Sequence, residues 1–179
     1  MSSYFIKPSD VEVGQHMYAS HQVMYSMANT QQTLDLFKKV IKAAKKTVIK
    51  EMRERLSGTA KTKPIMYMLR SIKRHGTSGQ CCSYKPYIAL EVDIKSNRTL
   101  NKMALTVAHE LVHAEQYLSR RLDWDNKVSC FKWEGKVNKN KGSTHERYMS
   151  QPWEQEAYAL QALYAAKIIS YIEIEENKK

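Results

Sequence analysis

Apolar residues recur with the period of a helix in the first third and in the last part of the chain. From Thr33 to Leu56 they return every three or four positions, which predicts one amphipathic helix, and Gly58 just beyond it is a typical C-terminal stop. Pro152 is expected to open a final helix from about Trp153 to Glu173. A shorter helix is predicted over Ile65–Lys73, which follows a proline.

The middle of the chain carries the alternation that is typical of strands. In Tyr87–Ile94 apolar side chains occupy every second position, which predicts a half-buried strand. A helix should follow from about Thr99 to Arg120, because capping residues stand at its start. The sequence CFKWEGK within Lys127–Val137 predicts two short strands joined at Gly135. Gly142–Gln151 is expected to be a loop.

These elements predict an α+β fold with more helix than sheet, in the order helix, helix, strand, helix, hairpin, helix. The chain has 179 residues, which favours a single domain over residues 1–179. Hydrophobic residues make up 42% of the chain, while glycine and proline number only six and four, so a globular chain is expected rather than a disordered one.

Positive charge is concentrated in one segment. Residues 38–74 hold thirteen Lys and Arg against two Glu, and thirteen minus two equals the net charge of +11. Such a one-sided field attracts polyanions, for example nucleic acid, an acidic protein or an anionic surface. The alternative is the solvated face of an amphipathic helix, where lysines are common. The residues expected to contact a polyanion are Lys38, Lys42, Lys45, Lys46, Arg53 and Arg55.

Cysteine usage and hydropathy indicate a cytoplasmic protein. Three cysteines and an N-terminal segment without an apolar signal core favour reduced thiols. The adjacent pair Cys81 and Cys82 lacks the spacing of a zinc clip or a redox motif, so a structural role is expected. The longest apolar stretch, Ala157–Ile174, is interrupted by polar residues, which argues against a membrane span.

The most informative chemistry lies in the sequence HELVH, inside the helix predicted from Thr99. His109 and His113 are four residues apart, so both lie on one face of a helix and could bind one zinc ion. Glu110 lies about 100° round the helix, where it suits a general base acting on a water at the metal. Two ordinary histidines are the alternative. Their apolar neighbours favour zinc, because buried polar side chains without partners are unfavourable.

A catalytic zinc site needs a third protein ligand, and three residues after the motif could supply it. They are His145, Glu154 and Glu156. The two glutamates are two apart on the predicted last helix, so only one can face the metal. Glu154 shares its side with apolar residues that should face the core, and it is therefore preferred. Glu156 and His145 remain alternatives.

HELVH, followed about forty residues later by WEQEA, resembles the gluzincin class of zinc metallopeptidases. It is similar to small single-domain zincins of phages and bacteria, in which a segment P-[WY]-E-x-[DE]-A follows H-E-x-x-H. In related gluzincins the ligand glutamate stands three residues before an alanine, which maps Glu154 onto the ligand and Ala157 onto the alanine. The resemblance covers Tyr87 to about Ala166 and is specific for metal rather than for substrate.

The resemblance implies a mainly helical, zincin-like domain with a small antiparallel sheet. Residues 1–80 would form a basic helical N-terminal part, and residues 84–175 the catalytic zinc-binding core. Tyr87–Ile94 would be the edge strand along which an extended substrate binds. The chain departs from SprT-like DNA–protein-crosslink proteases, whose third ligand is a histidine soon after the motif, and it lacks the H-x-x-G-x-x-H extension of metzincins. A phage origin would place the protein in the host cytoplasm.

The expected function is that of a zinc metallopeptidase, which hydrolyses a protein or peptide substrate with Glu110 as general base. Tyr148 and His145 precede the last helix and could steady the oxyanion, with ordinary surface positions as the alternative. Two other functions remain open. One is a nucleic-acid-binding protein whose zincin domain is inactive or acts on DNA-bound proteins, and the other is a metal-dependent hydrolase of a non-protein amide.

Overall fold

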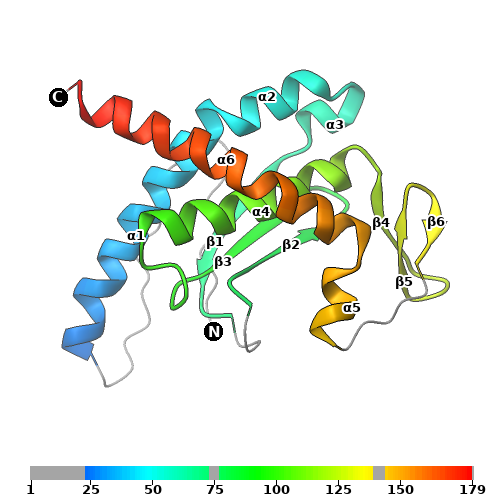
Figure 1. Cartoon of the computed structure of the whole chain (residues 1–179), viewed down its shortest axis with the longest axis horizontal. Helices are drawn as coiled ribbons and strands as arrows, with labels where there is room; N and C mark the ends of the chain where they lie inside the picture. The colour runs from blue at the N-terminus through cyan, green and yellow to red at the C-terminus, as the bar shows by residue number, and fades with distance from the viewer. Residues whose placement is uncertain (1–22, 73–76, 139–143, 179) are drawn as a thin grey trace.

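A computed structural model describes residues 23–72, 77–138 and 144–178 of the chain. Four helices make up most of the described structure. They are α1 (Val23–Lys46), α2 (Val48–Arg55), α4 (Leu100–Leu118) and α6 (Pro152–Glu176). Two single-turn helices, α3 (Gly58–Thr62) and α5 (His145–Met149), complete the helical part. With two small sheets they form an α+β fold that is mainly helical, as the sequence predicted (Figure 1).

The helix predicted over Thr33–Leu56 exists, but it starts earlier and is divided in two. α1 begins at Val23, and the chain breaks at Thr47, where ψ is −96°. The Thr47 hydroxyl donates to the Ala43 carbonyl at 2.9 Å, which satisfies an acceptor at the end of α1. The helix ends before Gly58, whose φ of +55° lies in the left-handed region and which begins α3.

The prediction of a helix over Ile65–Lys73 is wrong, because this segment contains strand β1 (Ile65–Arg70). It pairs in parallel with β3 (Ile88–Asp93), and β3 pairs antiparallel with β2 (Gly79–Ser83), giving the order β1-β3-β2. Periodicity cannot separate a short apolar run in a buried strand from one in a helix, so the pairing partner decides. Residues 73–76 lie outside the described part.

β3 confirms the strand predicted at Tyr87–Ile94 but is not half-buried. All six of its residues are buried, because it is the central strand of the sheet. Glu91, expected on the polar side, is 3% exposed and pairs with Arg70 and Gln80. Asp93 is 4% exposed and accepts backbone hydrogen bonds from Ile72 and Ser96, both at 2.8 Å. Internal partners therefore compensate both carboxylates for the loss of water.

α4 lies between the sheet and α6, and this packing makes the core. It contacts β2 and β3 on one side and α6 on the other, and Figure 1 shows α6 crossing in front of it. The predicted cap is confirmed: the Thr99 hydroxyl accepts from the Lys102 amide at 3.4 Å. Fully buried side chains from α1, β3, α4 and α6 meet here, among them Phe37, Leu90, Leu111 and Ile168.

A second small sheet follows α4. Its strands are β4 (Leu122–Asp125), β5 (Cys130–Trp133) and β6 (Lys136–Val137), in the order β4-β5-β6. The predicted hairpin is confirmed, and Gly135 at its turn has a φ of +79°; β4 was not predicted. The loop predicted at Gly142–Gln151 is wrong in part, because α5 forms where the Thr144 hydroxyl accepts from the Arg147 amide. Residues 142 and 143 lie outside the described part.

In the part of the chain that the structure describes, no helix is long and apolar enough to cross a membrane. The cysteines at positions 81, 82 and 130 are free thiols.

Candidate metal centre

The two histidines of HELVH meet on the buried face of α4. His109 and His113 are 9% and 7% exposed, and their rings pack edge to face with centroids 4.8 Å apart. Their Nε2 atoms are 3.1 Å apart. One turn of helix separates the two residues, so α4 alone directs both nitrogens to the same point.

α6 brings Glu154 to this point. Pro152 begins the helix, which places Glu154 in its first turn, where α6 crosses α4. One carboxylate oxygen lies 3.3 Å from Nε2 of His109 and the other 3.4 Å from Nε2 of His113. The ligand atoms of the three residues all lie within 4.8 Å of one another, and all three side chains are buried.

This donor set fits a metal ion. Two imidazole nitrogens and a carboxylate are the ligands of many catalytic zinc sites, which leave a fourth position open. The Oε2 atom of Glu154 is buried without a hydrogen-bond partner, and so is Oε2 of Glu110. Buried polar atoms are rarely left without partners, so both oxygens are consistent with a site that holds an ion and its water.

Two glutamines orient the imidazoles. Nδ1 of His109 lies 3.1 Å from Oε1 of Gln161, and Nδ1 of His113 lies 2.9 Å from Oε1 of Gln116. A carboxamide oxygen can only accept, so each Nδ1 carries the donated hydrogen and each Nε2 is left to face the centre. Gln161 was not identified from the sequence. It is seven residues after Glu154 and therefore on the same face of α6, but its contact with His109 is seen only in the folded chain.

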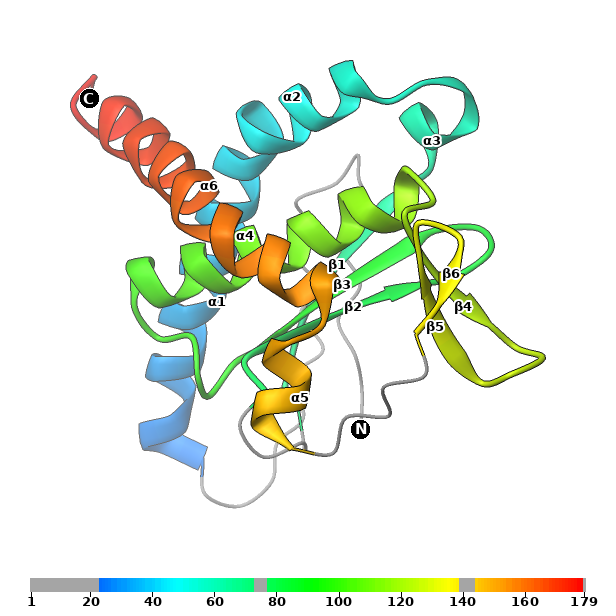
Figure 2. The same cartoon turned by 45° about the vertical axis from the view of Figure 1, so that its right-hand side comes forward.

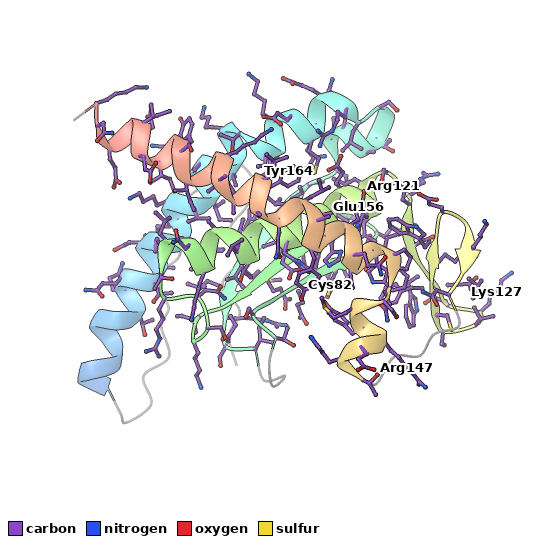
Figure 3. The ribbon with its side chains drawn as sticks, in the orientation of Figure 1. Cys82, Arg121, Lys127, Arg147, Glu156 and Tyr164 are labelled. Carbon is purple, nitrogen blue, oxygen red and sulfur yellow. The ribbon has the colours of Figure 1, made fainter. Side chains whose placement is uncertain are left out.

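Glu156 has a different place from Glu154. It accepts from the Gln116 amide at 2.8 Å and from Arg121 at 2.9 Å, and the same Gln116 amide donates to the Trp153 carbonyl at 3.0 Å. Figure 3 shows Glu156 on α6 close to Arg121, which follows the end of α4. These contacts anchor Gln116, so Glu156 acts on the centre through Gln116 and His113 rather than as a member of the donor set.

Glu110 lies beside the donor set and is buried, with 5% of the residue exposed. Burial raises the pKa of Glu110 to about 7, although the charges of the two histidines oppose this shift. A carboxyl with a pKa near neutrality can take up and release a proton under ordinary conditions. The geometry and the pKa therefore both suit a general base.

Gly79 allows β2 to approach Glu110. A Cβ atom at this position would lie 2.8 Å from Oε1 of Glu110 and 2.7 Å from Cγ2 of Thr106. Such distances are too short for non-bonded contacts, so a side chain would push β2 away from α4. The sequence showed only a glycine in a loop-like segment, and its role depends on the packing of β2 on α4.

The charges of the metal-free centre are coupled. Burial disfavours the imidazolium of His113, but the nearby carboxylates of Glu154 and Glu110 outweigh burial and raise the pKa of His113 to about 9. Burial alone would raise the pKa of Glu154, but the two imidazoles beside it lower that pKa to about 2. A proton on His113 thus occupies the place where a metal would bind, and metal and proton compete for the same nitrogen.

The centre lies at the base of a cleft of about 960 Å³. One wall is β2, whose residues 79–81 line the cleft, and residues of β4, β5 and α5 line it as well. Figure 2 shows where these elements lie around β2. Aromatic rings cover the β4–β5 wall: Trp124 and Phe131 are 4.9 Å apart, and Phe131 and Trp153 are 5.4 Å apart. The cleft therefore has a polar base and an aromatic side.

The prediction that Tyr87–Ile94 is an edge strand along which a substrate binds is wrong. β3 is the central strand and has a neighbour on each side, so its backbone cannot pair with a substrate. The edge strand on the cleft is β2, whose only partner among the described strands is β3.

Two tyrosines and one histidine lie around the opening of the centre. Tyr148 on α5 lies close to Glu154, and burial together with the charge of Glu154 raises the pKa of its hydroxyl well above the usual range. The rings of Tyr158 and His109 pack together with their centroids 4.8 Å apart. His145 is exposed on α5 and lines the cleft, but it is not part of the three-residue donor set. Tyr158 was not identified from the sequence.

The six basic residues predicted to contact a polyanion do not line this cleft, since all of them lie on α1 and α2. Comparison of the chain with protein-family models, with curated proteins and with solved structures finds no match. The resemblance to gluzincins therefore depends on the residues of the motif, and the function must be argued from the geometry of the site.

Proposed function

We propose that this protein is a zinc metallopeptidase in which His109, His113 and Glu154 hold the metal and Glu110 is the general base. The observation that carries the proposal is the convergence of two Nε2 atoms and a carboxylate, from two helices, beside a buried carboxyl with a pKa of about 7. A structural zinc site has no need of such a carboxyl or of an open cleft. When bound, zinc supplies Lewis acidity and lowers the pKa of a bound water towards ~7.

The side chains around the centre have distinct tasks in this reaction. Glu110 takes a proton from the attacking water and passes it to the nitrogen of the leaving amine. The hydroxyl of Tyr148 lies beside Glu154 and can donate to the carbonyl oxygen as negative charge develops there. Gln116 and Gln161 hold the imidazoles in the tautomer that leaves Nε2 free.

An extended peptide suits this cleft better than a small amide. The free edge of β2 offers backbone donors and acceptors along residues 79–81, and a peptide can add to such an edge as a further strand. The rings of Trp124 and Phe131 offer an apolar surface for a side chain of that peptide. This favours peptide hydrolysis over hydrolysis of a non-protein amide.

The test measures bound metal and proteolysis together. Native mass spectrometry of protein purified without added zinc should show about one zinc per chain. Glu154→Ala should lose the zinc, while the matched control Glu156→Ala should keep it. Glu110→Gln should keep the zinc and lose cleavage of an unfolded protein substrate by a factor of at least about 1,000.

Two outcomes would reject the proposal. One is a wild-type protein that takes up no zinc even when zinc is supplied. The other is a Glu110→Gln variant that cleaves as fast as the wild type, because the reaction would then not use this carboxyl.

A further inference from the structure

Among the basic residues of segment 38–74 that the structure describes, two groups differ in their contacts. In the first group each basic side chain forms an ion pair or a hydrogen bond with another residue of the chain. Lys39 pairs with Glu176, Arg55 with Glu115 at 3.0 Å, Arg70 with Glu91 and Lys38 with Asp35 at 3.5 Å. Arg53 is turned inward, where its guanidinium donates to the carbonyls of residues 60 and 63. Three of the residues predicted to bind a polyanion, Lys38, Arg53 and Arg55, thus have partners within the chain.

The second group consists of Lys42, Lys46, Lys50 and Lys61, which we call the basic face. All four are exposed, and none forms a salt bridge or side-chain hydrogen bond with another described residue. Lys42 and Lys46 are four residues apart on α1 and so lie on one side of it, while Lys50 follows on α2 and Lys61 on α3. Of the two acidic residues in the segment, Glu51 pairs with Lys167, which leaves Glu54 as the remaining acid there.

The basic face borders a hollow of about 360 Å³. Basic side chains from three helices surround it: Lys45 from α1, Lys50 and Arg53 from α2, and Lys61 from α3. Its floor includes Tyr67 of β1, and the Lys45 ammonium lies 5.5 Å from the centre of that ring. Lys50 and Lys61 of the basic face therefore border a concave surface together with Lys45, which raises the local potential for an anion.

The surroundings of the basic face discriminate between kinds of polyanion. Helices that bind a membrane surface carry exposed apolar side chains beside their lysines. In the described part of the chain, the large exposed hydrophobic side chains all lie outside α1, α2, α3 and β1. Proteins that bind single-stranded nucleic acid stack bases on exposed aromatic rings. The aromatic ring at this hollow, Tyr67, is only 2% exposed.

What remains is a surface of lysines that can contact phosphates but cannot insert into lipid or stack on bases. We propose that the basic face binds the phosphate backbone of duplex nucleic acid, without sequence specificity, through Lys42, Lys46, Lys50 and Lys61. Phosphate contacts of this kind supply most of non-specific binding. The hollow beside the basic face is lined by Ile65 and Tyr67 of β1, the edge strand opposite β2 and the cleft, so a duplex and a peptide can be bound together.

The test is a salt titration of binding. Fluorescence anisotropy of a labelled DNA duplex of about 20 base pairs is measured between about 50 and 200 mM KCl. The variant changes Lys42, Lys46, Lys50 and Lys61 to Gln. The matched control changes four exposed lysines elsewhere, Lys85, Lys95, Lys102 and Lys136, to Gln, so both proteins lose four positive charges.

The wild type should bind with an affinity that falls steeply with salt. If each of the four lysines neutralises one phosphate, the basic-face variant should lower the slope of log K against log [salt] by about 3–4 units and weaken binding by at least about tenfold. The control should keep most of the slope. Circular dichroism and zinc content should be the same for all three proteins, which separates this result from the peptidase proposal.

Three results would overturn the proposal. The first is a wild type that does not bind the duplex at about 50 mM KCl. The second is an equal loss of slope in variant and control, which would mean that net charge alone attracts the DNA. The third is binding to vesicles of phosphatidylcholine and phosphatidylserine without binding to the duplex.

Discussion

At the scale of single residues, the centre depends on side chains that do not touch the proposed metal. Gln161 and Gln116 fix the orientation of the histidines, and Glu156 and Arg121 anchor Gln116 in turn. Such outer contacts decide which nitrogen of an imidazole is available to a metal.

Loss of the hydrogen bond between Gln161 and His109 should therefore weaken metal binding. Gln161 is only partly buried, so Gln161→Leu removes the acceptor for Nδ1 without opening the core. We expect zinc affinity to fall by about 10- to 100-fold in competition with a chromophoric chelator. Gln155→Leu, at an exposed position of the same helix, should bind zinc like the wild type. Equal affinity in the two variants would show that Gln161 does not orient His109.

Glu110 should reduce the stability of the metal-free protein at high pH. Its pKa is about 7 in the folded chain and 4.5 as the ordinary value, so the carboxyl binds its proton more tightly in the folded state. The penalty begins as the pH rises above 4.5 and is complete above about 7. Glu110→Gln removes it.

In protein treated with a chelator, Glu110→Gln should raise the free energy of unfolding by about 3 kcal/mol near pH 8 and by about 1 kcal/mol or less near pH 5. Urea unfolding at the two pH values measures the difference. Glu146→Gln, at an exposed position of α5, should change stability little at either pH. A gain that is the same at both pH values would mean that Glu110 is not buried in its charged form.

At the scale of elements, the close packing of β2 on α4 builds one wall of the cleft and confines Glu110. This contact depends on the absence of a side chain at Gly79. The strand that borders the cleft is thus positioned by the same contact that holds the general base.

Gly79→Ala should disturb both the position of β2 and the position of Glu110. The added methyl group overlaps Thr106 and Glu110, so we expect a loss of about 1–3 kcal/mol in unfolding free energy and at least about a tenfold decrease in kcat/KM for peptide cleavage. Ser83→Ala, at the other end of β2, is the control. Unchanged stability in Gly79→Ala would show that β2 can move away from α4 without penalty.

Elements were predictable where their signals are local. Thr99 and Pro152 mark the starts of α4 and α6 correctly, because a cap and a proline act within one turn. β1 was mistaken for a helix, because its short apolar run takes strand form only when paired with β3, some twenty residues later. β2 was missed for the same reason, since its residues have little strand character until they pair.

At the scale of the whole molecule, β2 lines the cleft and β1 lines the hollow beside the basic face, and these two strands are the opposite edges of one sheet. The sequence showed the excess positive charge but not its division. Tertiary contacts join Lys39 to Glu176 and Arg55 to Glu115, so carboxylates of the chain offset part of these positive charges. A helical wheel cannot show such pairing, because the partners come from distant segments.

The sequence by itself determined the α+β class, the helix that carries HELVH and the common direction of His109 and His113, since these follow from spacing within one helix. It also favoured Glu154 over Glu156, because the apolar side of an amphipathic helix faces the core. Only the tertiary structure decided which strand borders the cleft, that Gln161 supports His109, and how closely β2 approaches Glu110. Those features join residues far apart in the chain, and their distances are set by how helices and strands pack rather than by local propensity.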